Sequence, residues 1–349
     1  VCPQRHFARM NHSRSRPLLI GTEPSHLFLG RRGSGAVQAR WWRHQGPPLS
    51  ATADHSAKPS PWLVSPTVDL ALLVATPLVI VPVVTLAATV ASPEFIFLMV
   101  AAFASIGHHL PGFLRAYGDR ELFRRFHWRF LLAPPVALAV ALMFSLRGLH
   151  GLELVLLLWA TWHIMMQTYG FLRIYDMKAG RRDAISAWLG FALCSVIFLA
   201  GIVFSDARVF GMAETLLRIG LPVPDAGGLQ VLRWGVGIVS AVTICAYVVH
   251  EVRSGWSGVN PIKLLLLLST AWLYWTCGSV TTNLLVGVAM FEVFHALQYY
   301  AIVWTYNRRQ ADRAGGSFGP LGFLFRNRWY LLVVYCVLIA LFGSLRLVP

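Results

Sequence analysis

Charged side chains are scarce in this chain, and acidic ones are the scarcest. Only 13% of the 349 residues are charged, with 15 Asp or Glu against 30 Lys or Arg, whereas 56% are hydrophobic. Soluble domains carry about 25% charged residues, so the composition excludes an ordinary soluble protein. We therefore expect a polytopic membrane protein.

Several sequence motifs of catalysis and binding are also missing. The chain has no P-loop, no GxGxxG ahead of a helix, no GxSxG, no HExxH and no basic-aromatic surface for nucleic acid. Nucleotide-driven and hydrolytic enzymes are therefore disfavoured, and no nucleic-acid partner is expected. Cysteine is rare, with no CxxC pair, so we expect Cys194, Cys245, Cys277 and Cys336 to be small buried side chains rather than metal ligands.

Apolar runs long enough to cross a bilayer are abundant. A helix needs about 20 apolar residues to span the hydrocarbon core, and such runs predict an all-α, polytopic transmembrane helical bundle. Pro134 and Pro135 interrupt the third run, which is the least regular. The nine predicted spans are 66–91, 94–116, 130–147, 152–174, 185–204, 229–250, 261–281, 284–306 and 329–348.

The basic residues between these runs predict the orientation of the bundle. Short cytoplasmic loops retain Lys and Arg, and the loops after the even-numbered spans hold nearly all of them. The odd-numbered loops hold only Arg147, Arg208 and Arg218. This alternation predicts nine spans with the N-terminus inside and the C-terminus outside, and it explains most of the net charge of +15. We expect an integral protein of the bacterial inner (cytoplasmic) membrane.

Residues 1–60 differ from the remainder, residues 61–349, which form the predicted transmembrane domain. They hold nine Lys or Arg against Glu23 and Asp54, many Ser, Gly and Pro, and no sustained periodicity. We interpret them as a disordered basic segment, of the kind that an over-extended reading frame produces. An Arg-rich targeting peptide is the alternative.

Polar side chains at membrane depth are costly, so each points to the bundle interior or to function. The second span contains the adjacent His108 and His109, about 100° apart on a helix. We favour His108 as the inward-facing one, with His109 as the alternative. Pro111 cannot donate to the Gly107 carbonyl and should bend the helix beside them.

Two further spans carry polar groups on one face. In the fourth, His163 and Gln167 share a face, and Gln167 is placed to orient a liganding His163. In the eighth, Glu292 and His295 form an ExxH pair, the spacing with which helical bundles hold iron or manganese. Gln298 and Tyr299 flank that stripe as supporting groups.

Depth brings these residues together. His108, His163 and His295 lie 7, 10 and 13 residues before the first cytoplasmic arginine of their spans, which is roughly 10 to 20 Å below the interface. Three imidazoles and the carboxylate of Glu292 can then meet at one point. Such a ligand set without thiolate suits non-haem iron, and also zinc, manganese or copper.

The spans also end alike, with GFLRAYGD at 112–119 and GFLRIYD at 170–176. The Tyr and Arg of these stretches are typical of interfacial anchoring. We expect Asp119 and Asp176 to pair with Arg115 and Arg173, or to line the cytoplasmic mouth of a site.

The scattering of His108, His109, His163 and His295 over several spans, with the acidic Glu292, resembles the histidine-rich integral-membrane oxygenases. The similarity is to the Brp/Blh-type carotene dioxygenases and, more distantly, to the membrane fatty-acid desaturases and hydroxylases. It covers spans two to eight and implies an iron centre that oxidises a hydrophobic lipid or isoprenoid with dioxygen. The HxxxH and HxxHH clusters of the desaturases are absent, so a di-iron desaturase centre is disfavoured.

Two other functions stay open. In a haem-b membrane redox protein, two of the span histidines would clamp the iron, which leaves Glu292 without a role. In a transporter, Glu292, His163 and His295 would relay protons or bind a substrate near the midplane, and in a scaffold they would only bond helices together. The sequence assigns no catalytic residue and no redox partner, and membrane lipids are its expected surroundings.

Overall fold

The structure, a computed structural model, describes residues 60–149, 151–255, 259–314, 321–326 and 328–347. Within these ranges every regular element is helical, so the predicted all-α class is confirmed. The predicted disordered segment 1–60 lies outside the described residues, apart from Ser60.

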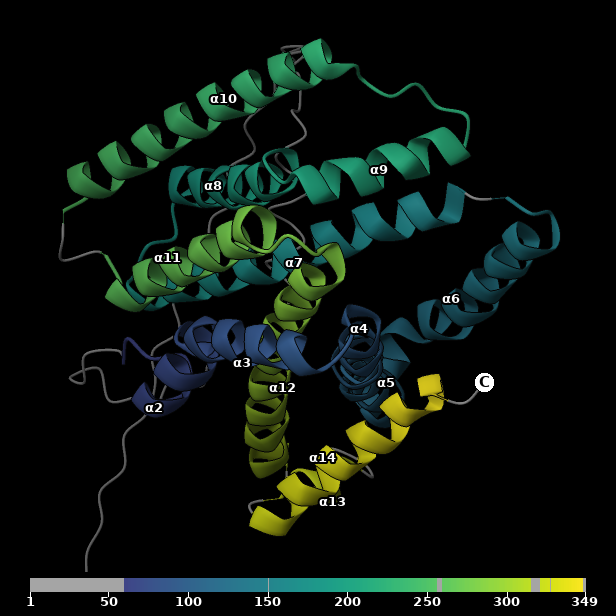
Figure 1. Ribbon diagram of the computed structural model, residues 1–349. Helices are drawn as coiled ribbons and strands as arrows, with labels where there is room; N and C mark the ends of the chain where they lie inside the picture. The colour runs from purple at the N-terminus through teal and green to yellow at the C-terminus, as the bar shows by residue number, and fades with distance from the viewer. Residues whose placement is uncertain (1–59, 150, 256–258, 315–320, 327, 348–349) are drawn as a thin grey trace, which may run out of the picture. The chain divides into compact units, whose positions relative to one another are not determined.

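The elements follow one another along the chain as a series of helices (Figure 1). They are α2 (Pro66–Val68), η1 (Asp69–Val74), α3 (Thr76–Val90), α4 (Pro93–Val100), η2 (Ala101–Ile106), α5 (His109–Gly118), α6 (Arg120–Leu146), α7 (Gly151–Lys178), α8 (Ala184–Val203), α9 (Asp206–Arg218), α10 (Ala226–Arg253), α11 (Pro261–Trp275), η4 (Thr276–Val280), α12 (Leu284–Ala314), α13 (Leu321–Leu324), α14 (Trp329–Ser344) and η5 (Leu345–Leu347). The elements η1, η2 and η4 are π-helical and η5 is a 3-10 turn.

Short polar side chains set where many of these helices begin. The hydroxyl or carboxylate of an N-cap residue accepts a hydrogen bond from a backbone N–H of the first turn, which otherwise has no partner. Asp119 does this for α6, Asp183 for α8, Ser205 for α9, Asp225 for α10 and Asn260 for α11. These caps fix where the five helices begin.

Six helices are long and apolar enough to cross a membrane, and the bent pair Pro66–Val74 and Thr76–Val90, at 41° to each other, brings the number to seven if it forms one span. An integral membrane protein is therefore supported, but the count of nine is not confirmed. The other two predicted spans correspond to α7 and to α11 with η4. The six helices are Pro93–Gly118, Arg120–Leu146, Ala184–Val203, Ala226–Arg253, Leu284–Arg313 and Trp329–Leu347.

The prolines of α6 do not interrupt it, contrary to the irregularity that we expected there. The helix runs from Arg120 to Leu146 through both, and its only non-helical backbone angles are at Phe126. Pro134 has no N–H for the Phe130 carbonyl, and the Tyr117 hydroxyl donates to that carbonyl instead, at 2.8 Å. A side chain of α5 thus completes the helix.

The amphipathic helix α9 was not predicted, because its 13 residues fall between two apolar runs. It begins at the Ser205 cap, where the side chain accepts from the N–H of Arg208. That cap, followed by apolar residues at helical spacing, is the signal that could have identified it.

Helix α12 is the central element and α6 the most peripheral. More than half of the apolar window of α12 is buried inside the chain, and none of that of α6. Helix α12 contacts α3, α4, η2 and η4 (Figure 1). Many large apolar side chains of α6, α10 and α14 are exposed, which suits lipid and not water.

The cysteine prediction is confirmed in part. Cys194 and Cys277 are buried, but Cys245 and Cys336 are exposed on the outer faces of α10 and α14. The expectation for these two was wrong because a residue within a span can face lipid as readily as the bundle interior.

Candidate metal centre

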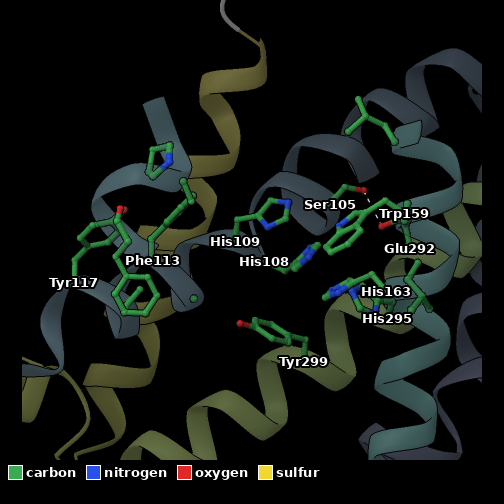
Figure 2. Close-up of a pocket in the computed structure, with 18 residues that line it drawn as sticks. Ser105, His108, His109, Phe113, Tyr117, Trp159, His163, Glu292, His295 and Tyr299 are labelled. Carbon is green, nitrogen blue, oxygen red and sulfur yellow. Dashed lines mark hydrogen bonds between the residues drawn. The ribbon is translucent and has the colours of Figure 1, made fainter. Parts of the chain in front are cut away.

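Three histidines from three separate segments converge at one point. His108 lies at the junction of η2 and α5, His163 on α7 and His295 on α12. One ring nitrogen from each lies within 4.8 Å of the others. The ring centroid of His295 lies 5.0 Å from that of His108 and 5.2 Å from that of His163. Figure 2 shows the three imidazoles facing one another, as their shared depth predicts.

An irregular stretch of backbone places His108. The π-helix η2 ends at Ile106, and the carbonyl of Gly107 accepts from the Leu110 N–H at 3.2 Å because Pro111 cannot donate to it. Gly107 is packed so closely that an added Cβ would lie 2.4 Å from the Phe103 carbonyl oxygen. The backbone beside the histidines is therefore irregular, with His108 at the junction of η2 and α5, while the predicted bend stays a prediction.

The hydrogen bonds of the imidazoles leave their metal-binding atoms available. His108 Nδ1 lies 2.7 Å from the Ala104 carbonyl oxygen, so this nitrogen carries the proton and Nε2 is the acceptor. His108 Nε2 and both ring nitrogens of His295 are buried without a hydrogen-bond partner among the described residues. Each such orphan costs about 1–3 kcal/mol, and a metal ion would satisfy them.

Glu292 and His109 lie beside this group and not in it. The Glu292 carboxylate accepts a hydrogen bond from the Ser105 hydroxyl at 3.0 Å and lines the same cavity, but it is not among the clustered ligand atoms. Its ligand role stays a prediction. His109 is exposed, so of the two adjacent histidines the structure selects His108, the one that we favoured.

Gln167 does not orient His163, which corrects our expectation. Its amide donates to the His295 carbonyl at 3.1 Å and to the Gln298 side chain at 3.3 Å. Gln298, only 2% exposed, donates in turn to the Leu73 carbonyl at 2.9 Å. The two amides therefore fasten the segment that carries His295 to α7 and η1. The Tyr299 ring lies 5.5 Å from that of His108, and its supporting role stays a prediction.

A cavity of about 620 Å³ opens in front of the histidines. Its wall is mostly aromatic and aliphatic, and α5, α6, α7 and α12 all contribute to it. Figure 2 shows Phe113 and Tyr117 on the side away from the three imidazoles. Phe130, Ala133 and Pro134 of the peripheral α6 complete that side. The cavity thus lies between the histidine centre and the helix most exposed to lipid.

The four residues predicted at a cytoplasmic mouth do not line this cavity. The Arg115 guanidinium stacks 4.2 Å from the centre of the Tyr306 ring, and Asp119 caps α6, so these two do not form the expected pair. Arg173 does pair with Asp176, at 3.2 Å. The Asp119 carboxylate accepts hydrogen bonds from the otherwise unpartnered N–H groups at the start of α6 instead of pairing with a cation.

A buried charge network lies around Asp176 instead. Lys263, only 1% exposed, bonds Asp176 at 2.6 Å and Glu251 at 2.9 Å, and Glu251 also pairs with Arg181. Sequence reasoning missed it, because a lysine and an acid at span ends are typical of solvated loops. The network joins α7, α10 and α11.

Comparison of the chain with protein-family models, with characterised proteins and with solved structures finds no match.

Proposed function

We propose that this chain is an integral-membrane metalloprotein in which His108, His163 and His295 hold one metal ion, and that it oxidises a hydrophobic substrate. The observation that carries the proposal is the convergence of three imidazole nitrogens within 4.8 Å of one another. They come from residues far apart in sequence, and packing alone gives no reason to collect three imidazoles, two of which carry buried ring nitrogens without a hydrogen-bond partner among the described residues.

Non-haem iron is the ion that we propose. Imidazole suits iron, zinc and copper, and three protein ligands leave coordination positions open, as a catalytic site requires. When bound, iron would supply activation of dioxygen. His108 fits such a site because its Nδ1 is committed to a backbone carbonyl, the usual support of a metal-bound imidazole.

The remaining residues of the site would bind and orient the substrate. The aromatic cavity side chains Phe113, Tyr117 and Trp159 give an apolar substrate rings against which it can pack. Glu292 and Tyr299 place a carboxylate and a phenol at the edge of the histidine group. The substrate class that these side chains fit is a hydrophobic lipid or isoprenoid molecule, and membrane lipids surround the outer helices.

The geometry favours this reading over haem b. Two axial histidines of a haem lie on opposite faces of a wide macrocycle, and a third imidazole within 4.8 Å of both would occupy the same space. A transporter or scaffold would give the three histidines hydrogen-bond partners across helices, whereas His295 has none among the described residues for either ring nitrogen.

We further propose the nine-span topology with the N-terminus inside, in a bacterial inner membrane. It follows if the bent pair, α7 and α11 with η4 all cross together with the six apolar helices. A span surrounded by other helices tolerates polar side chains, and α7 and α11 carry the buried Asp176 and Lys263.

Metal content and a visible spectrum of the detergent-purified protein test the function. We expect stoichiometric iron without a Soret band in the wild type, and its loss in His163→Ala and in His295→Ala. His109→Ala is the matched control, since it removes an adjacent imidazole outside the group and should keep the metal. A Soret band lost with the histidines would indicate haem, and a metal-free wild type would leave the transporter or scaffold. Glu292→Ala measures whether the carboxylate is a ligand.

A further inference from the structure

A second cavity, of about 260 Å³, lies next to the histidine cavity. Its lining comes from α7, α8, α9, α11 and α12, and it shares Ala160 and Glu292 with the first cavity. The two cavities therefore adjoin each other at Ala160 and Glu292. The proposed function makes no use of the second cavity.

Arg208 of α9 lines this second cavity. It donates one hydrogen bond to the Gly201 carbonyl at 3.2 Å and lies 5.9 Å from the centre of the Phe291 ring. It forms no ion pair with any acid in the part of the chain that the structure describes. A guanidinium carries five N–H donors, so most of its hydrogen-bonding capacity is left for a ligand.

Tyr274 of α11 lines the same cavity and provides a second donor. It is only 2% exposed, and its hydroxyl has no hydrogen-bond partner among the described residues. The ring cannot easily turn away, because it packs 4.1 Å from the Phe198 ring and 4.6 Å from the Phe291 ring. A buried unpartnered hydroxyl is uncommon and calls for an explanation.

We infer that the second cavity binds the carboxylate end of a long-chain amphiphile. A cation and a phenol with an unused proton both require an acceptor, and a carboxylate accepts from each. The hydroxyl of Thr215, which also lines the cavity, already donates to the Gly211 carbonyl. The aliphatic residues Leu158, Ile202 and Val288 suit the adjoining methylene groups.

Glu292 is compatible with an anionic ligand because of where it is held. Its carboxylate accepts from Ser105, which lines the first cavity and not the second. Because Ala160 is small and lines both cavities, an alkyl chain held at Arg208 would extend past it toward the histidine cavity. This last step rests on the proposed function and narrows its substrate to one with an acidic end.

Binding of radiolabelled oleate to the purified protein in non-ionic detergent tests the inference, with labelled methyl oleate as the uncharged comparison. Arg208→Met should weaken oleate binding about tenfold or more, as expected for a lost charge-assisted hydrogen bond. The binding of methyl oleate should be unchanged. Arg218→Met is the matched control, since Arg218 lies on the same helix but is exposed and paired with Glu214.

Tyr274→Phe separates ligand binding from folding. It removes the hydroxyl and keeps the ring, so we expect weaker oleate binding together with an unchanged or higher melting temperature in the absence of oleate. Equal binding of oleate and its methyl ester, or oleate binding that survives Arg208→Met, would overturn the inference. Oleate binding retained in metal-free His163→Ala would support it independently of the metal centre.

Discussion

Replacing Gln167 by Met should weaken metal binding without removing a ligand. Gln167 donates to the His295 carbonyl at 3.1 Å and to the Gln298 amide at 3.3 Å, and Met has a similar length but no donor. The backbone at His295 then loses its tie to α7. Loss of such supporting hydrogen bonds typically lowers metal affinity about 10- to 100-fold, which equals about 1.4–2.8 kcal/mol.

The assay is metal retention against a graded series of chelator concentrations, with melting temperature measured on the same samples. Two buried acceptors lose a donor, so the free energy of unfolding should fall by about 1–3 kcal/mol. Gln298→Met and the double variant complete a double-mutant cycle. Because the two amides contact each other, their effects should be less than additive.

Two results would refute this reasoning. Complete loss of metal in Gln167→Met, as deep as in His163→Ala, would mean that Gln167 is itself a ligand. Unchanged affinity together with a lower melting temperature would mean that the amides hold the helices together but do not position His295.

Two further predictions concern the surroundings of the centre. Lys263→Met should lower the free energy of unfolding by up to about 3–5 kcal/mol, because Asp176 and Glu251 lose a shared buried cation. Thermal unfolding measures this loss. As the control, Arg182→Met changes an exposed residue and should unfold at nearly the wild-type temperature. Gly107→Ala should cost about 1–3 kcal/mol by overpacking against the Phe103 carbonyl and should reduce iron content, since the strain falls beside His108; full iron content in a destabilised variant would contradict the second part.

The sequence predicted well those features that depend on the cost of placing polar side chains in the membrane hydrocarbon. The cost of polar groups in hydrocarbon predicted that His108, His163 and His295 lie in the bundle interior, and their similar depth in the predicted spans predicted that they lie near one another. The structure does cluster them. This reasoning needs only helical rise and the positions of arginines, so it identified the three clustered histidines.

What failed depended on rotation and on partners distant in sequence. Whether Gln167 faces the His163 ring or the His295 backbone depends on how α7 is rotated against α12, and periodicity within one helix does not contain that information. Pro134 reads as a break until Tyr117, 17 residues earlier, is known to donate to the Phe130 carbonyl. Lys263 reads as a loop residue until two acids of other helices surround it.

The difference in burial between α12 and α6 affects which positions of this protein can tolerate substitution. His295 and the Gln298 amide belong to the buried α12, whereas α6 contributes Phe130, Ala133 and Pro134 to the cavity and none of its apolar window is buried. Substitutions at those three positions reshape the space before the histidines with little effect on the core. Natural variation or directed evolution can thus change the shape of the cavity while the histidine cluster stays constant.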